Sequence, residues 1–242
     1  MNIVITMAGK GSRFVDAGYK IPKFMIEAKG KTLFEWSMMS LEGYKDNDNK
    51  YIFIVRKEHN CKQFIIEKCK DFKFNNVDII EIDYLTDGQA TTAMLAKEFW
   101  NKEDSLLIYN IDTFVEPYEM NKDELKGDGF IPCFKGKGDH WSFVKLDKNG
   151  TAIEVVEKRR ISQNCSLGSY YFKTAKLYED LYNKYYLNNN LINNEKYIAP
   201  LYNYLIKDGG KVYISIIKTE KIHVLGTPKE LELFLTSDYI YN

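Results

Sequence analysis

The chain has 242 residues, of which 45% are hydrophobic, and its formal net charge at pH 7 is zero. This length and composition suit the core of one α/β domain, and without a basic surplus or an arginine-rich stripe we expect no nucleic-acid partner. Since no apolar run approaches the about 20 residues of a membrane-spanning helix, we also expect no membrane insertion.

The four cysteines indicate reduced thiols. They form no C-x-x-C motif and no Cys/His cluster, which in a chain of this size argues against disulfides and against a structural zinc site. The sequence begins directly with a strand-like apolar run, and no secretory signal pattern stands at its start. We therefore expect a cytoplasmic protein.

The first predicted strand, residues 2–6, runs into a glycine-rich loop, Met7-Ala8-Gly9-Lys10-Gly11-Ser12-Arg13-Phe14, and Pro22-Lys23 follows closely. Glycine lets backbone N–H groups approach an anion without a Cβ in the way. Arginine offers a planar fork for phosphate oxygens, and lysine offers a compact charge. This combination predicts a polyphosphate-binding site.

The loop matches neither of two common phosphate motifs. A dinucleotide fingerprint, G-x-G-x-x-G, would need glycine in place of Phe14, and the Walker A string G-x-x-x-x-G-K-[ST] occurs nowhere in the chain. An ordinary tight turn is the alternative. Because only four residues of the chain are arginine, the presence of Arg13 in this loop favours a functional role.

Apolar runs alternate with helical patterns over the first 110 residues, which predicts a mostly parallel sheet. The expected strands are residues 2–6, 51–55, 77–82 and 105–109. The expected helices between them are residues 32–42, 59–70 and 89–99.

Two polar segments follow predicted strands of this sheet. Asp112 comes just after strand 105–109, and ligands of open α/β sheets lie beyond the carboxyl ends of the strands. Its carboxylate could hold Mg²⁺ or only cap a turn. Gly88 and Gln89 open a predicted helix, where glycine permits close approach of a flat base and the amide can read a base edge; the alternative is a plain helix start capped by Asp87.

Short apolar segments stand close together in the second half of the chain, at residues 129–134, 141–147, 151–157 and 167–172. The turn Lys148-Asn149-Gly150 predicts a hairpin. Helices are expected at 174–186 and 195–207, then a strand at 211–217 and a helix at 228–238 that starts at Pro228. Apolar residues of this last helix could pack internally or across a homo-oligomer interface; they are Leu231, Leu233, Phe234 and Leu235.

The string G-x-G-S-R-F followed by P-K resembles the signature of the sugar-phosphate nucleotidyltransferases, G-x-G-[ST]-R followed by P-K. The resemblance implies one Rossmann-like α/β domain over residues 1–242, with a central mixed, mostly parallel sheet flanked by helices. Residues 1–115 would form a nucleotide-binding half and residues 116–242 an acceptor-binding half. It also implies a catalytic Arg13 and Lys23, and a nucleotide site made by Met7, Ala8, Gly9, Gly11, Ser12, Gly88 and Gln89.

The same resemblance extends along most of the chain. It implies that Asp112 is a Mg²⁺ ligand, that Glu157 and Lys158 bind the second substrate, and that Gly168 in the N-x-G-x-Y-x-F-like strand lets this acceptor lie against the backbone. Trp141 could wall the acceptor pocket or belong to the core. His223-Val224-Leu225-Gly226-Thr227-Pro228 matches the family's G-T-P segment.

Two positions depart from the family pattern. Val224 stands where many members have a second metal-binding aspartate, which puts a two-metal arrangement in doubt unless His223 substitutes. Arg159 and Arg160 replace the usual proline after the E-K pair and, with Lys158, could form an anion clamp for the acceptor. The alternative is a solvated basic turn.

Several strings, including E-K-R-R-I-S and H-V-L-G-T-P, resemble the branch of the family found in bacterial surface-polysaccharide clusters. This implies a nucleoside triphosphate substrate, with CTP favoured, and a small phosphorylated acceptor such as L-glutamine phosphate. A sugar-1-phosphate acceptor, a nucleotide-sugar glycosyltransferase and a non-catalytic nucleotide sensor are the alternatives.

Overall fold

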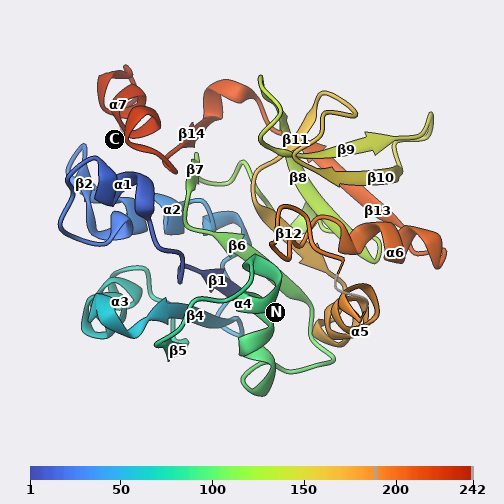
Figure 1. The fold of residues 1–242 in the computed structure, drawn as a ribbon, viewed down its shortest axis with the longest axis horizontal. Coiled ribbons are helices and arrows are strands. Elements are labelled where there is room, and N and C mark those ends of the chain that lie inside the picture. Colours follow the sequence, from blue (N-terminus) through green and yellow to red (C-terminus); the bar gives the residue numbers. More distant parts are fainter. Residues whose placement is uncertain (188–189, 241–242) are drawn as a thin grey trace.

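Four parallel strands form the first part of the central sheet, in the order β5–β4–β1–β6. The computed structural model describes residues 1–187 and 190–240 (Figure 1). The four strands lie where the apolar runs predict them: β1 (Asn2–Thr6), β4 (Lys50–Arg56), β5 (Asn76–Ile82) and β6 (Leu106–Asn110). The chain moves outward from β1 to β5 and returns to the other side of β1 with β6, so β1 and β6 meet at the switch in strand order.

The helices of the first half are shorter than the sequence pattern predicts. They are α1 (Ser12–Asp16), α2 (Leu33–Met39), α3 (Lys62–Asp71) and α4 (Gln89–Met94). Helix α1 was not expected. A capping box fixes the start of α2, because Thr32 Oγ1 accepts from the Glu35 N–H at 3.2 Å and the Glu35 carboxylate accepts from the Thr32 N–H at 2.8 Å. Among the described residues, no helix is both long and apolar enough to cross a lipid bilayer.

The smaller elements connect these strands and helices. A two-stranded pair, β2 (Glu27–Ala28) and β3 (Lys31–Thr32), precedes α2. The 3₁₀ turns are η1 (Lys23–Met25), η2 (Glu42–Tyr44), η3 (Lys57–His59), η4 (Leu95–Glu98), η5 (Lys122–Glu124) and η6 (Thr219–Lys221).

The second half extends the same sheet with antiparallel strands in the order β10–β9–β11–β8–β12–β6, and β13 lies parallel to β8. Its strands are β8 (Gly129–Lys135), β9 (Ser142–Leu146), β10 (Ala152–Glu157), β11 (Asn164–Ser166), β12 (Ser169–Phe172) and β13 (Val212–Ile216). Its helices are α5 (Ala175–Tyr186), α6 (Leu201–Lys207) and α7 (Pro228–Thr236). One mixed sheet therefore runs through both halves, which confirms the expected single α/β domain.

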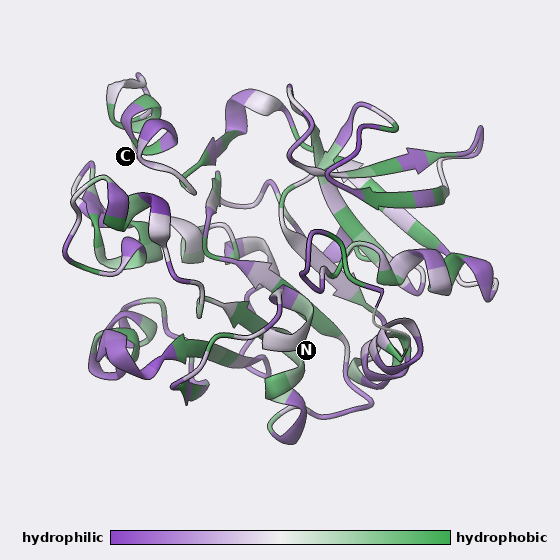
Figure 2. Cartoon of the chain, viewed as in Figure 1, coloured by the Kyte–Doolittle hydropathy of each residue, from purple (hydrophilic) through white to green (hydrophobic). Residues whose placement is uncertain are grey.

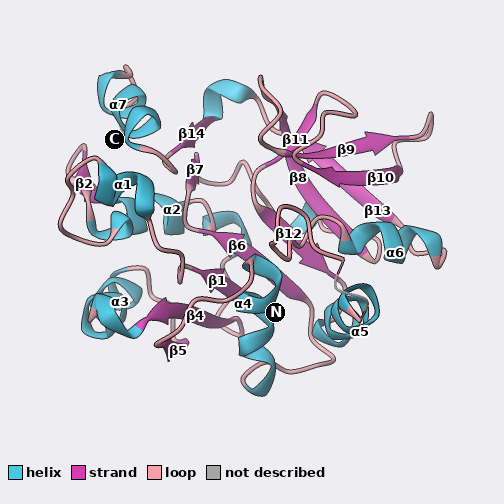
Figure 3. Cartoon of the chain, viewed as in Figure 1, coloured by secondary structure: helices cyan, strands magenta, loops and turns pink. Residues whose placement is uncertain are grey.

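Side-chain alternation along the strands divides the core between the two faces of the sheet. Ile3 and Ile5 pack with α2 and α3, whereas Val4 points to the opposite face, which α4, α5 and α6 cover. Figure 2 shows the apolar strands inside and polar residues on the outer helices, and Figure 3 shows the helices around the sheet. A third cluster joins Trp36 and Phe114 to Leu231 and Phe234 of α7, while Leu233 and Leu235 are exposed.

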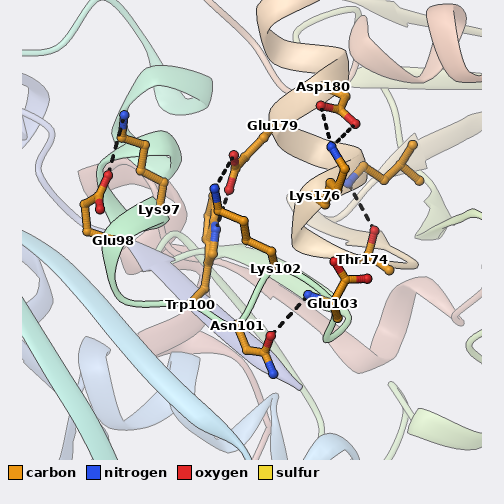
Figure 4. A network of polar contacts seen from close by, with 11 residues as sticks. Lys97, Glu98, Trp100, Asn101, Lys102, Glu103, Thr174, Lys176, Glu179 and Asp180 are labelled. Carbon is orange, nitrogen blue, oxygen red and sulfur yellow. Dashed lines mark hydrogen bonds and ion pairs between the residues drawn. The ribbon is translucent and has the colours of Figure 1, made fainter.

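A polar network joins the loop after η4 to α5 (Figure 4). The Trp100 indole N–H donates to Glu179 at 2.8 Å, and Lys102 lies 3.5 Å from the same carboxylate. Thr174 caps α5 by accepting from the Leu177 N–H at 3.1 Å. The contacts of Glu179 hold α5 against the loop that leads into β6.

Two expected elements differ from the structure. The helix expected at 195–207 begins only at Leu201, after Pro200, because proline lacks the N–H that a helix interior needs and is tolerated at a helix start. The strand expected at 167–172 is confirmed only as β12 over residues 169–172; a further short strand, β11, precedes it, and Gly168 turns between the two with a φ of 78°. The chain before Pro200 turns at Asn193 and Asn194 and is not helical at residues 195–197, which contribute to the site.

Candidate functional site

A cavity of about 490 Å³ opens at the carboxyl ends of β1 and β6, at the switch in strand order. Segments from both halves of the chain line it. They are the glycine-rich loop, the start of α4, the residues after β6 and a non-helical segment before α6. The lining residues include Thr6, Met7, Ala8, Gly9, Lys10, Ser12, Lys23, Gly88, Gln89, Asn110, Asp112, Glu195 and Tyr197.

The glycine-rich loop forms one wall of this cavity. Gly11 adopts a φ of 61° and precedes α1, a conformation that favours glycine. A Cβ at Gly9 would meet no heavy atom within 4 Å, so the backbone there is open to a ligand. The Arg13 side chain is exposed on α1, does not line the cavity, and makes no hydrogen bond or ion pair with the part of the chain that the structure describes.

A second cavity of about 350 Å³ lies on the other side of the same loop, next to the end of β4. Lys10, Lys20, Lys23 and His59 contribute to its lining. Burial lowers the pKa of His59, and its Nδ1 is buried without a hydrogen-bond partner among the described residues. Lys10 lines both cavities and was missed from the sequence, although its place between Gly9 and Gly11 could have indicated it.

Lys23 and Asp112, two residues that the sequence assigned to separate roles, form an ion pair. Pro22 precedes η1, which directs Lys23 toward the end of β6. The segment around G-T-P lies against the same aspartate: the Leu225 N–H donates to the Asp112 backbone carbonyl at 2.7 Å, and a Cβ at Gly226 would lie 3.7 Å from the carboxylate oxygen Asp112 Oδ2. The residue predicted to bind an anion and the residue predicted to bind a metal therefore converge here.

The donors around Asp112 fit a magnesium ion shared with a ligand. In residues 1–187 and 190–240 no group of three or more His, Cys, Asp or Glu side chains could hold a metal alone. Val224, at the family's second acidic position, lies in β14 (Ile222–Val224) beside β7 (Thr113–Val115). Asn110 Oδ1 is buried without a described partner. Since Mg²⁺ typically takes one or two carboxylates plus phosphates and water, Asp112 suffices as a protein ligand.

The start of α4 forms the opposite wall. The Gln89 amide donates to Thr6 Oγ1 at 3.1 Å, which holds its side chain at the cavity edge. Asp87 does not cap α4; it pairs with Lys196 at 2.8 Å and accepts from Thr91. Although burial acts to raise it, these hydrogen bonds leave the pKa of Asp87 below its usual range.

The E-K pair at the end of β10 lies beside the cavity. Glu157 is 9% exposed and accepts from Ser142, whose hydroxyl also contacts the Tyr170 hydroxyl at 3.0 Å. Burial raises the pKa of Glu157, against the lowering effects of Ser142 and Lys158. Lys158 adopts a φ of 53° and its ammonium donates to the Tyr197 hydroxyl, which faces the cavity.

Glu195 and Tyr197 were missed because residues 195–207 were interpreted as one helix. The Tyr197 hydroxyl donates to Glu195, so the two side chains meet at the cavity wall. Burial, and then the Glu195 carboxylate, raise the pKa of this phenol. Pro200 was the available signal, because it places the helix start after this segment.

Three solved structures resemble this chain over nearly their full length. The nucleoside-diphosphate-sugar pyrophosphorylase from Vibrio cholerae RC9 shares 36% identity, with 97% of this chain and 100% of that chain covered and a TM-score of 0.89. The chain belongs to the sugar-phosphate nucleotidyltransferases. This confirms the family that the glycine-rich loop and Pro22-Lys23 indicated.

Two more distant structures share the nucleotidyltransferase fold. The inositol-1-phosphate CTP transferase from T. maritima has 14% identity, 99% and 98% coverage and a TM-score of 0.74. HddC from Yersinia pseudotuberculosis has 19% identity, 97% coverage of both chains and a TM-score of 0.67. No family model matches this chain, and neither does any curated protein.

Four residues assigned to the acceptor site have other partners in this nucleotidyltransferase. Arg160 donates to the Gly136 and Gly138 carbonyls, at 2.9 and 3.0 Å, and lies over the Phe143 ring. Its guanidinium thus holds the loop between β8 and β9, and these contacts give no support to the anion clamp, which stays a prediction. Arg159 is directed along β10, 3.5 Å from Glu154.

Trp141 and Gly168 have structural contacts as well. The Trp141 indole donates to the Lys137 carbonyl at 2.8 Å and packs edge-on against Phe134. A Cβ at Gly168 would lie 2.1 Å from Asn110 Nδ2. Glycine is therefore needed here to make room for the Asn110 side chain, and the contact of Gly168 with the acceptor stays a prediction.

Proposed function

We propose that this nucleotidyltransferase transfers a nucleotidyl group from a nucleoside triphosphate to a small phosphorylated metabolite and releases pyrophosphate. The observation that carries the proposal is the single cavity shared by the glycine-rich loop, the Lys23–Asp112 pair and the Tyr197 hydroxyl on Lys158. Lys10 and Lys23 line the cavity and suit a triphosphate, and Lys158, bound to the lining residue Tyr197, is the cation that we assign to a second phosphate.

In this reaction an oxygen of the acceptor phosphate attacks the α-phosphorus, and the bond from that phosphorus to the bridging oxygen of the β-phosphate breaks. The attacking oxygen is already an anion, so no general base is needed, and the electron pair leaves with pyrophosphate. Lys23 would neutralise charge around the α-phosphorus. The loop amides, Lys10 and Arg13 would hold the leaving pyrophosphate.

The cofactor would be Mg²⁺, with Asp112 as its protein ligand. When bound, the ion would supply positive charge between the carboxylate and the nucleotide phosphates. Met7, Ala8, Gly9, Gly11 and Ser12 would contact the phosphates, and Gly88 and Gln89 the base. Glu157 and Lys158 would bind the acceptor. We leave Arg159 and Arg160 out of this site, because of the partners described above.

For the substrates, we propose CTP and L-glutamine phosphate, giving CDP-L-glutamine for the phosphoramidate modification of a capsular polysaccharide. Support comes from the resemblance of the E-K-R-R-I-S and H-V-L-G-T-P strings to that branch of the family. The carboxylate of an amino-acid acceptor would suit an arginine of the predicted clamp. Arg160 adds no support for such an acceptor, since it donates to the Gly136 and Gly138 carbonyls. A sugar-1-phosphate acceptor with CTP, UTP or dTTP is the second candidate, favoured by the name of the 36% identical relative.

The test is a pyrophosphate-release screen of the four common nucleoside triphosphates against sugar-1-phosphates, phosphocholine and L-glutamine phosphate. Release that depends on both substrates supports the nucleotidyltransferase. A preference of about tenfold for glucose-1-phosphate over L-glutamine phosphate in kcat/KM, about 1.4 kcal/mol, would reject the amino-acid acceptor. Sugar transfer without pyrophosphate would indicate a glycosyltransferase instead.

A further inference from the structure

Residues 195–197 lie between the turn at Asn193 and Asn194 and the start of α6. Glu195 and Tyr197 line the cavity. Lys196 does not line it and pairs with Asp87 at 2.8 Å. The Lys196 ammonium also lies 5.4 Å from the ring centre of Tyr186.

Backbone hydrogen bonds fix this segment to the start of α4. The Lys196 N–H donates to the Asp87 carbonyl at 2.7 Å, and the Ala90 N–H donates to the Lys196 carbonyl at 3.0 Å. The Tyr186 hydroxyl holds the Tyr197 carbonyl at 2.6 Å. Glu195 and Tyr197 therefore have a fixed backbone, which suits side chains that select a ligand.

The Tyr197 hydroxyl links the segment to the end of β10. It accepts from the Lys158 ammonium and donates to the Glu195 carboxylate, so an ammonium, a phenol and a carboxylate form one chain of hydrogen bonds. The Lys158 ammonium also lies 4.6 Å from the Tyr197 ring centre, within the range of a cation–π contact. Tyr197 thereby fixes where the positive charge of Lys158 lies.

This chain of groups has a definite chemical preference. An ionised carboxylate only accepts hydrogen bonds. A ligand body beside Glu195 must therefore present donors, as hydroxyl or ammonium groups do. The opposite end of the cavity holds Lys10 and Lys23, which suit the triphosphate.

We propose that Glu195 and Tyr197 determine acceptor specificity: Tyr197 positions Lys158 for the acceptor phosphate, and Glu195 accepts hydrogen bonds from the acceptor body. The acceptor class is a phosphorylated metabolite whose body carries hydroxyl or ammonium donors. This inference rests on the proposed function.

The first experiment compares Tyr197→Phe with Tyr185→Phe, a tyrosine on α5 outside the cavity, as the matched control. Tyr197→Phe should raise the acceptor KM by about tenfold, because it removes a hydrogen bond to a charged group. The KM for the nucleotide and the melting temperature should stay near the wild-type values. An unchanged acceptor KM, or an equal rise in both KM values, would overturn the role of Tyr197.

The second experiment uses Glu195→Gln and paired acceptors: glucose-1-phosphate with its deoxy analogues, and phosphoethanolamine with phosphocholine. Within the pair that the enzyme uses, wild type should have the higher kcat/KM for the acceptor with more hydrogen-bond donors. Glu195→Gln should reduce this ratio of kcat/KM values about tenfold or more. The glucose-1-phosphate pair tests hydroxyl donors, and the phosphoethanolamine pair tests ammonium donors. An unchanged preference would overturn the role of Glu195.

Failure of this inference is distinguishable from failure of the proposed function. If wild type releases pyrophosphate and both variants behave like it, only the inference fails. If wild type releases none with any pair of substrates, the proposed function fails, and the acceptor inference with it.

Discussion

The two ends of the cavity are built in different ways. The end that we propose for the triphosphate comes mainly from one continuous stretch, residues 7–23, in which the glycine-rich loop and Lys23 are close in sequence. The end that we propose for the acceptor is assembled from the end of β10 and residues 195–197, which are far apart in the chain. A short motif can therefore reveal the first end, whereas the second exists only once the sheet has formed.

Removal of divalent metal should have the largest effect, because it acts at the junction of the two ends. We expect activity to vanish with a chelator and to return with Mg²⁺. Asp112→Asn should raise the Mg²⁺ concentration needed for half-maximal activity by at least about tenfold. Mutation of a residue that only supports a metal ligand already lowers metal affinity by about this factor. Asp71→Asn on the surface of α3 is the control. Full activity without divalent metal would contradict the assignment of Asp112.

Removal of a positively charged side chain from the end that we propose for the triphosphate should have the next largest effect on activity. Lys23→Ala and Arg13→Ala should each lower kcat by about 10²–10³. The Lys23–Asp112 pair is partly exposed, so stability should change by less than about 1 kcal/mol. Lys62→Ala, on α3, is the matched control in steady-state kinetics and thermal melts. Near-normal turnover of either variant would remove that residue from the mechanism.

Gly88→Ala should disrupt the contact between the start of α4 and Lys196. A Cβ would lie 2.3 Å from the Lys196 carbonyl oxygen, and the φ of 140° is strained for alanine. We expect a loss of at least about 1–3 kcal/mol in the free energy of unfolding, measured with urea. Gly209→Ala has a φ of 86° but meets no atom within 4 Å, so it should cost less. Equal losses would show that the contact with Lys196 is unimportant.

Alanine variants of the two arginines distinguish a role in binding the acceptor from a structural role. Arg160→Ala should lower the free energy of unfolding by about 1–2 kcal/mol, since it leaves the Gly136 and Gly138 carbonyls without their donor. The acceptor KM should not change. Arg159→Ala, whose side chain is 69% exposed, should change neither quantity. A selective rise in acceptor KM for either variant would restore the clamp.

The smallest expected effect is on stability at the acceptor end. Burial raises the pKa of Glu157 in the folded state. The protonated side chain therefore contributes favourably to the free energy of unfolding below about pH 4.3, the pKa of an unfolded glutamate. This contribution is lost as the pH rises through the folded-state pKa. Glu157→Gln should therefore stabilise the fold at neutral pH by up to about 1 kcal/mol, and the gain should shrink toward about pH 4. Urea unfolding at both pH values measures this; a gain independent of pH would contradict it.

Prediction succeeded where a local pattern was sufficient. The alternation of apolar runs and helical segments predicted the strands β1, β4, β5 and β6, because β1, β4 and β6 bury side chains on both faces of the sheet and the edge strand β5 packs partly buried apolar side chains against it. It was wrong for residues 195–200, since an apolar pattern alone does not distinguish a helix from an extended segment. Pro200 would have resolved this.

One short stretch of sequence was enough to indicate the family and to predict a phosphate-binding loop, because glycine, arginine and the P-K pair act through backbone geometry and charge over a few residues. The folded chain alone shows that Lys23 meets Asp112, that Arg160 binds backbone carbonyls, and that Tyr197 contacts Lys158. These partners come together through the order of strands in the sheet, which no local spacing encodes.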